Sequence, residues 1–124
     1  MTSAIRVLFV DDDIVVRQVL TRMLGAYPDI EVVGEAATGD EAIVAVEMFQ
    51  PTVITMDIRM PKMDGIAAAR VIKANHPEVI IIGLSEYAHG YHADALEKAG
   101  AWRIYHKSKA SEELYAAIRE ATAS

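Results

Sequence analysis

The chain has 124 residues, enough for one domain with a single core, and 52% of them are hydrophobic. A net charge of −6 argues against nucleic-acid binding, and no apolar run reaches the ~18 residues of a membrane span. The absence of cysteine excludes a disulfide framework, and a start without a basic region and apolar core does not resemble a signal peptide. We therefore expect a cytoplasmic globular domain.

Strand-like and helix-like segments alternate along the whole chain, which is the pattern of an α/β fold with a parallel sheet. In chain order, strands are predicted at about 5–10, 31–36, 53–56, 79–84 and 102–106. Helices are predicted at about 14–26, between Thr38 and Pro51, at 65–74, at 90–99 and from Ser111 onward. Five strands and five helices leave no room for a second unit, so residues 1–124 are predicted to form one domain.

Polar residues in front of three helices predict where those helices begin. Asp13 directly precedes the first helix and can cap it, and Ser111 is expected to cap the last one. Thr38 and Glu41 form a capping box for the second helix. Helical spacing predicts an inward apolar stripe on the first helix at Val16, Val19, Leu20, Met23 and Leu24, and on the second at Ile43, Val46 and Met48.

Chemically distinctive side chains follow four of the predicted strands. They are Asp11, Asp12 and Asp13 after the first strand, Asp57 after the third, Ser85 after the fourth and Lys107 after the fifth. Because the carboxyl ends of parallel strands share one edge of a sheet, where ligands bind, we expect these side chains to meet. The sequence therefore predicts a pocket that holds a divalent cation and accepts a phosphoryl group.

Each of these residue types suits one part of that chemistry. Asp57 is the expected nucleophile, because a carboxylate can accept a phosphoryl group whose charge is neutralised. Asp11 and Asp12 would hold Mg²⁺, which prefers oxygen ligands. Lys107 would neutralise a phosphoryl oxygen and pair with Asp57 when the site is empty, and Ser85 would donate its hydroxyl. Taken singly, these residues are also common as turn, capping or solvated surface residues.

Two other groups of residues are interpreted as structural or solvated. His89 and His92 are three residues apart, but they have no further evident ligands for a metal and are expected to be solvated. Met56, Met60 and Met63 are expected to fill gaps near the pocket.

The segment from Val53 to Gly65, which contains Asp57, Met60-Pro61 and Met63-Asp64-Gly65, is highly specific in pattern. With the acids, Ser85 and Lys107 it resembles the CheY-like receiver domain of two-component response regulators, over essentially the whole chain. Residues 107–114 resemble the NarL/FixJ-like class. The resemblance implies a flavodoxin-like doubly wound sheet of five parallel strands, with five helices and the order 2-1-3-4-5, which is carried over from the family.

The resemblance also implies a function as a phosphoacceptor switch. A sensor histidine kinase or phosphotransfer protein would supply the phosphoryl group, and the surface of the fourth helix, fifth strand and fifth helix would change. The domain would assist its own phosphorylation and dephosphorylation without being an enzyme on another substrate. Members of the class usually carry a C-terminal DNA-binding domain, which these residues do not contain, and a phosphorylation-dependent homodimer is expected from the family.

The resemblance assigns roles to residues at the site. Asp57 would be the phosphoacceptor, and Lys107 and Ser85 would bind the phosphoryl group. Mg²⁺, or Mn²⁺, would be held by Asp12, Asp57 and the Arg59 backbone carbonyl, and by Asp11 through water.

The chain departs from the family pattern near the last strand. Many receivers have an aromatic residue where this chain has Ile104, and Tyr105 should point to the opposite face. We expect weaker coupling, or a partial substitute in Tyr87 or Trp102. Arg59 and Tyr87 occupy positions that border the path of the hydrolysing water, and Tyr87 is predicted to shield the acyl phosphate.

Two alternatives belong to other functional classes. The first is a phosphorylation-independent interaction module with the same fold, for which Ile104 is the supporting feature. The second is a flavodoxin-like enzyme that binds a flavin or nucleotide. Such an enzyme needs a glycine-rich or hydroxyl-rich phosphate loop after the first strand, and here that loop is Asp11-Asp12-Asp13.

Overall fold

Five parallel strands form one sheet in the order β2-β1-β3-β4-β5 in the computed structural model, which describes residues 4–86 and 88–123. The strands are β1 (Ile5–Val10), β2 (Ile30–Ala36), β3 (Val53–Met56), β4 (Ile80–Ser85) and β5 (Ala101–His106). The helices are α1 (Ile14–Gly25), α2 (Gly39–Phe49), α3 (Gly65–Asn75), α4 (Tyr91–Lys98), the short 3₁₀ helix η1 (Lys107–Lys109) and α5 (Ala110–Thr122). The predicted sheet order is confirmed, and every predicted strand boundary agrees within one residue.

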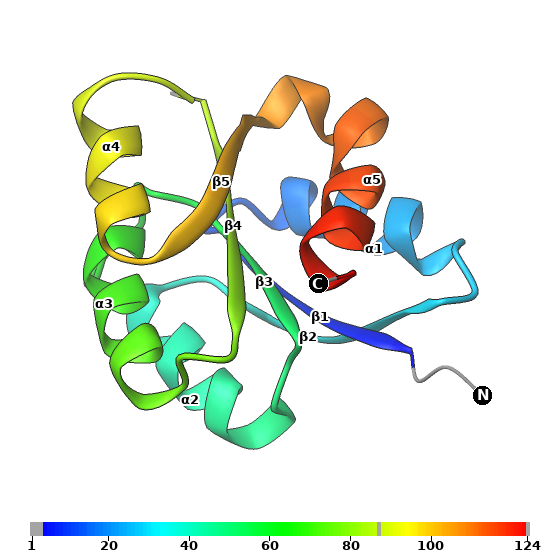
Figure 1. Cartoon of the computed structure of the whole chain (residues 1–124), viewed down its shortest axis with the longest axis horizontal. Helices are drawn as coiled ribbons and strands as arrows, with labels where there is room; N and C mark the ends of the chain where they lie inside the picture. The colour runs from blue at the N-terminus through cyan, green and yellow to red at the C-terminus, as the bar shows by residue number, and fades with distance from the viewer. Residues whose placement is uncertain (1–3, 87, 124) are drawn as a thin grey trace.

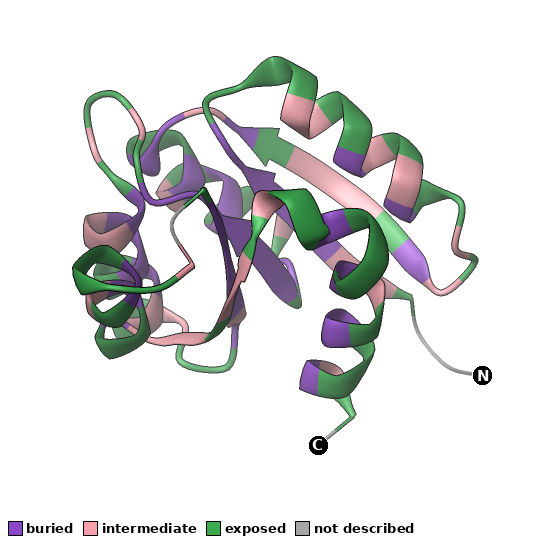
Figure 2. Ribbon diagram, turned by 90° about the horizontal axis from the view of Figure 1, so that it is seen from above, coloured by how far each residue is buried: buried purple, intermediate pink, exposed green. Residues whose placement is uncertain are grey.

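The helices cover both faces of the sheet, α1 and α5 on one face and α2, α3 and α4 on the other (Figure 1). β1 shows why both faces are apolar: Val7 and Phe9 pack toward α1 and α5, whereas Leu8 and Val10 pack toward the other three helices. A parallel strand covered on both sides needs such a continuous apolar run. The core is therefore two layers that flank the sheet. The central strands β1, β3 and β4 are largely buried, whereas most residues of the edge strands β2 and β5 are of intermediate burial or exposed (Figure 2).

Side-chain caps fix the starts of two helices as predicted. Asp13 Oδ1 accepts a hydrogen bond from the Val15 amide at 2.9 Å, and Thr38 Oγ1 accepts one from the Glu41 amide at 3.1 Å. The Glu41 carboxylate accepts from the Ala37 amide at 2.9 Å, one residue before the cap. The capping box is thus present in a slightly extended form.

The start of α5 differs from the prediction that Ser111 caps it. The chain turns directly after β5 into η1, where the His106 ring accepts a hydrogen bond from the Ser108 amide at 3.1 Å. α5 then begins at Ala110, and no side-chain hydrogen bond caps it. The cap prediction is wrong because η1 starts the helical path before Ser111 is reached.

Two predicted core positions are instead exposed. Val19 is 56% exposed and Met48 is 68% exposed. The inward face of α1 centres on Leu20 and Leu24, so Val19, turned by about 100° from its neighbour, lies at the rim. Among residues 4–86 and 88–123, no helix is both long and apolar enough to cross a bilayer.

Candidate functional site

Two acids lie side by side at the carboxyl edge of the sheet because β1 and β3 are neighbours. The Asp11 amide donates to the Ala36 carbonyl of β2 at 3.0 Å, and the Asp57 amide donates to the Val10 carbonyl of β1 at 2.9 Å. These bonds continue the strand ladders by one residue and fix both positions. Asp11 and Asp57 are only 2% and 6% exposed, so their carboxylates are largely removed from water.

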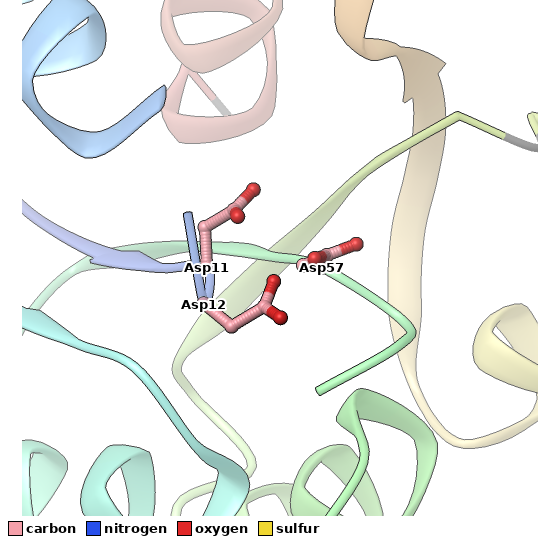
Figure 3. A group of neighbouring side chains, drawn as sticks. All are labelled: Asp11, Asp12 and Asp57. Carbon is pink, nitrogen blue, oxygen red and sulfur yellow. The ribbon is translucent and has the colours of Figure 1, made fainter. Parts of the chain in front are cut away.

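Asp12 completes a group of three carboxylates (Figure 3). Asp11, Asp12 and Asp57 each offer an oxygen, and these oxygens lie within 4.8 Å of one another. Asp12 is exposed, so the group opens toward solvent. Hard cations such as Mg²⁺ bind through a few carboxylate oxygens together with water, and this donor set fits them. Within the described part of the chain, no other group of three or more possible metal ligands is found.

Lys107 reaches both buried acids from the end of β5. Its Nζ lies 2.8 Å from Asp11 Oδ2 and 3.2 Å from Asp57 Oδ2. The predicted contact with Asp57 is confirmed. The closer contact with Asp11 was not anticipated, because a strand-end rule places residues at one edge but does not say which pairs touch.

Burial and neighbouring charges shift the pKa values of Asp57 and Lys107. Burial, together with the neighbouring Asp11 carboxylate, raises the pKa of Asp57 to about 6, although Lys107 opposes the shift. Burial alone would lower the pKa of Lys107, but its hydrogen bonds and its charge interactions with Asp11 and Asp57 raise it. The single positive charge of Lys107 thus faces two crowded carboxylates, Asp11 and Asp57. This arrangement favours the binding of a further cation at the site.

The loop after β3 folds back onto Asp57. The Ile58 amide donates to Asp57 Oδ1 at 2.8 Å, and the Gly65 amide donates to the Ile58 carbonyl at 2.8 Å. Asp64 then caps α3 by accepting from the Ala67 amide at 2.9 Å. The Asp64-Gly65 pair, singled out in the sequence, therefore closes the loop beside Asp57 and starts the next helix.

A pocket of about 580 Å³ opens above these acids. It is lined by Asp12, Asp13, Ile14, Asp57, Arg59, Ser85, Glu86 and Lys107. Ser85 is 2% exposed at the end of β4, whereas Arg59 is exposed. The structure therefore brings all the predicted strand-end residues together, and the Arg59 carbonyl as a ligand stays a prediction. Met56, Met60 and Met63 pack in the core layer under α2, α3 and α4, as expected.

Ile104 and Tyr105 point to opposite sides of the sheet, as predicted. Ile104 packs against the layer that contains α4, and Tyr105 against the layer that contains α5. An irregularity in the pairing of β4 with β5 leaves Trp102 on the same side as Tyr105. Tyr87 lies outside the described residues.

Sequence reasoning missed Arg17. Its side chain donates to the backbone carbonyl of Asp11 at 2.7 Å. The available signal was its spacing of four residues from Asp13, which places it one helical turn beyond the acidic loop.

Comparison with known proteins identifies the family of this chain. Residues 7–119 match the family model of the response regulator receiver domain. A protein-glutamate methylesterase/protein-glutamine glutaminase of Nocardioides sp. is 44% identical over 97 residues, which are 78% of this chain and 26% of that protein. In eight of the curated relatives that it matches, the chain spans between 21% and 54% of the relative's length.

Solved receiver domains share the fold closely. The response regulator domain of Thermotoga maritima CheB is 32% identical with a TM-score of 0.88, and the match covers 95% of this chain and 96% of that one. The receiver domain of NarL from Mycobacterium tuberculosis is 25% identical with a TM-score of 0.90, and the match covers 97% of both chains. The fold, the acidic edge and the family match agree, and the chain belongs to the CheY-like response regulator receiver domain family of two-component signalling.

Proposed function

We propose that this receiver domain accepts a phosphoryl group on Asp57. The observation that carries the proposal is the placement of Lys107 Nζ 2.8 Å from Asp11 and 3.2 Å from Asp57, beside a third carboxylate and a pocket open to solvent. A buried carboxylate with an adjacent cation can act as a nucleophile toward an anionic phosphoryl group, whose charge must be neutralised.

Three side chains of this protein take part in the proposed phosphoryl transfer. A carboxylate oxygen of Asp57 forms the new O–P bond as the N–P bond of a phosphohistidine breaks, and the imidazole leaves with the bonding electrons and takes up a proton. Lys107 stabilises the charge on the phosphoryl oxygens, and the Ser85 hydroxyl donates a hydrogen bond to one of them. Lys107 is already at the site, so little side-chain reorganisation is needed.

Asp11, Asp12, Asp57 and the Arg59 backbone carbonyl would hold Mg²⁺ or Mn²⁺, with Asp11 acting through water. When bound, the cation supplies the positive charge that the phosphoryl oxygens require. Support comes from the three carboxylates, whose oxygens lie within 4.8 Å of one another.

The proposed phosphoryl donor is a sensor histidine kinase or a phosphotransfer protein in the cytoplasm. Ile14, Val15 and Val19 are 57%, 59% and 56% exposed on α1, and Ile14 also lines the pocket. An apolar strip at the rim of the site can pack against a donor protein while its phosphohistidine enters. No nucleic acid or membrane is proposed as a partner of this domain.

Phosphorylation would change the surface of α4, β5 and α5, and a phosphorylated homodimer is one form that the output can take. Ile104 favours a second candidate, a phosphorylation-independent interaction module, because it replaces the expected aromatic residue. The methylesterase activity named for the Nocardioides relative is not proposed for this chain, which matches 26% of that protein.

The test is the intact mass of the protein after incubation with acetyl phosphate and Mg²⁺. We expect one added phosphoryl group in the wild type, and none with EDTA or in Asp57→Asn. The matched control is Asp13→Asn, which removes a neighbouring charge but keeps a good helix cap and is expected to be phosphorylated.

The remaining outcomes separate the two candidates. If the wild type binds Mg²⁺ without forming an adduct, the donor is replaced by a phosphohistidine protein. The proposal fails if neither donor labels the wild type, and a domain that also binds no Mg²⁺ then fits the interaction module.

A further inference from the structure

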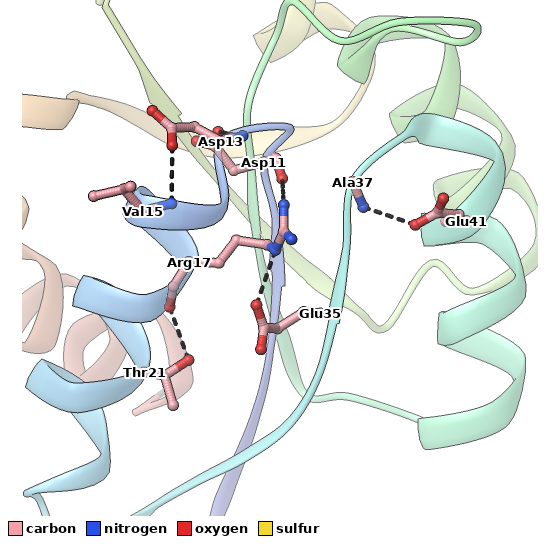
Figure 4. A network of polar contacts seen from close by, with 8 residues as sticks. All are labelled: Asp11, Asp13, Val15, Arg17, Thr21, Glu35, Ala37 and Glu41. Atoms are coloured by element: carbon pink, nitrogen blue, oxygen red, sulfur yellow. Dashed lines mark hydrogen bonds and ion pairs between the residues drawn. The ribbon is translucent and has the colours of Figure 1, made fainter.

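Arg17 of α1 forms a hydrogen bond with the acidic loop between β1 and α1 (Figure 4). Arg17 Nη1 donates to the backbone carbonyl of Asp11 at 2.7 Å, and Nε donates to Glu35 Oε1 of β2 at 2.9 Å. The Arg17 side chain is only 14% exposed, and that of Glu35 is 44% exposed. One guanidinium therefore joins the end of β1 to the edge strand of the sheet.

These contacts fix the peptide that leads into Asp12. The Asp11 amide is bound to β2, its carboxylate accepts from the Asp13 amide at 2.9 Å, and its carbonyl accepts from Arg17. The Asp11 carbonyl belongs to the peptide unit that joins Asp11 to Asp12. Its orientation therefore determines where the exposed Asp12 carboxylate can lie.

The properties of these hydrogen bonds suit a residue that holds the acidic loop in place. A bond from a charged donor to a carbonyl is stronger than a neutral one. The planar fork of arginine bonds two partners at once without rearranging. A surface ion pair with Glu35 alone would contribute little, but the bond to Asp11 is made by a largely buried side chain. Removing it would leave the Asp11 carbonyl without its charged donor.

We propose that Arg17 is a positioning residue for the metal-binding carboxylates, and that Glu35 holds Arg17 in place. The inference rests on the proposed binding of Mg²⁺ by Asp11, Asp12 and Asp57. Groups that orient metal ligands commonly change metal affinity by about 10- to 100-fold when they are removed, and this sets the size of the expected effect.

The main experiment is calorimetric titration of Mg²⁺ into Arg17→Gln, Arg17→Lys and Glu35→Gln. Arg17→Gln is expected to weaken Mg²⁺ binding about 10-fold. Arg17→Lys should recover part of the loss, because an ammonium group can still donate to the Asp11 carbonyl, and Glu35→Gln should have a smaller effect. The matched control is Arg22→Gln, an exposed arginine in the last turn of the same helix, which should bind as the wild type does.

A second measurement needs no metal. The Asp13 amide donates a hydrogen bond to the Asp11 carboxylate. With EDTA present, this amide should exchange its hydrogen faster in the Arg17→Gln variant than in the Arg22→Gln variant. If Arg17→Gln lowers stability but leaves both the Mg²⁺ affinity and this exchange unchanged, Arg17 is merely structural and the inference is wrong. If the wild type binds no Mg²⁺, the proposed metal site fails, whereas the exchange rates still decide whether Arg17 positions the loop.

Discussion

A β-carbon on residue 65 would lie 1.9 Å from the carbonyl oxygen of Asp57. The loop between β3 and α3 can therefore close against Asp57 only because residue 65 is a glycine. The same residue donates its amide to the Ile58 carbonyl at 2.8 Å, and the Ile58 amide bonds the Asp57 carboxylate. The position of the proposed nucleophile thus depends on a backbone contact eight residues further along the chain.

Gly65→Ala is expected to destabilise the protein and to slow phosphorylation, because the added methyl group pushes the loop away from Asp57. Overpacking of this kind commonly lowers the free energy of unfolding by about 1–3 kcal/mol. Urea denaturation in EDTA measures the stability, and the rate of adduct formation with acetyl phosphate measures the effect on the site.

The control is Gly25→Ala at the end of α1, where an added β-carbon would meet nothing within 4 Å. It should leave stability within about 0.5 kcal/mol of the wild type. Equal stability of the two variants would mean that the loop relaxes at no cost, contrary to the tight contact seen here.

Asp57→Asn is expected to stabilise the metal-free protein at pH 8. The pKa of Asp57 is raised from 3.8 to about 6, so the folded state holds the proton more tightly than the unfolded state. Ionisation of Asp57 therefore lowers the free energy of unfolding as the pH rises from about 4 to about 6, by on the order of 3 kcal/mol. The variant lacks this loss, and its Lys107 still has Asp11 as a partner.

Thermal denaturation in EDTA at pH 4 and pH 8 measures this difference. The variant should be more stable than the wild type at pH 8 and nearly equal to it at pH 4, where Asp57 is protonated. Added Mg²⁺ should reduce the difference in stability between the variant and the wild type at pH 8. An ion that binds the folded state stabilises it, and the wild type keeps the Asp57 carboxylate proposed to bind Mg²⁺. A variant that is less stable than the wild type at pH 8 would show that the charge of Asp57 is already well compensated by Lys107.

Local patterns in the sequence were sufficient to predict the sheet and the residues at its edge. Alternating apolar runs set the strand positions within one residue, and the carboxyl-end rule brought Asp11, Asp57, Ser85 and Lys107 together. The strand order itself came from the resemblance to a family, because five parallel strands allow several orders with the same local pattern.

What the sequence did not predict depends on contacts between elements. The bond from Arg17 to the Asp11 carbonyl and the preference of Lys107 for Asp11 arise only when β1, α1 and β5 are placed in space. The early turn of η1, where the His106 ring accepts a hydrogen bond from the Ser108 amide, makes Ser111 the second residue of α5 instead of its cap. The exposure of Val19 follows from the turn of about 100° that separates it from the buried Leu20 on the same helix.

Ile104→Tyr is expected to increase the response of the α4, β5 and α5 surface to phosphorylation. Ile104 lies opposite Gly83, where a β-carbon would be 2.6 Å from Ile104 Cγ1 and 2.9 Å from Leu96 Cδ2. Ile104 thus packs inward against β4 and α4. A tyrosine ring at this position can alternate between inward and outward rotamers when the site fills. The measurement is the change in backbone chemical shifts of α4 and α5 on phosphorylation.

Tyr105→Phe is the control for this substitution, since it alters an aromatic side chain on the opposite face of β5 without changing its size. It should leave the shift changes as they are in the wild type. An unchanged response in Ile104→Tyr would show that the departure at residue 104 has no part in coupling.

The double substitution Val15→Gln and Val19→Gln is expected to slow phosphoryl transfer from a protein donor, but not from acetyl phosphate. Both side chains are more than half exposed on α1, so their replacement by a polar residue should affect docking more than folding. Loss of an apolar interface contact worth more than about 1 kcal/mol would lower the transfer rate at least about 5-fold. The rate is measured with a phosphorylated histidine kinase that labels the wild type.

Val44→Gln is the matched control, because Val44 is 58% exposed on α2, across the sheet from α1. A similar loss with both donors would place the effect at the phosphorylation site instead of at a docking surface.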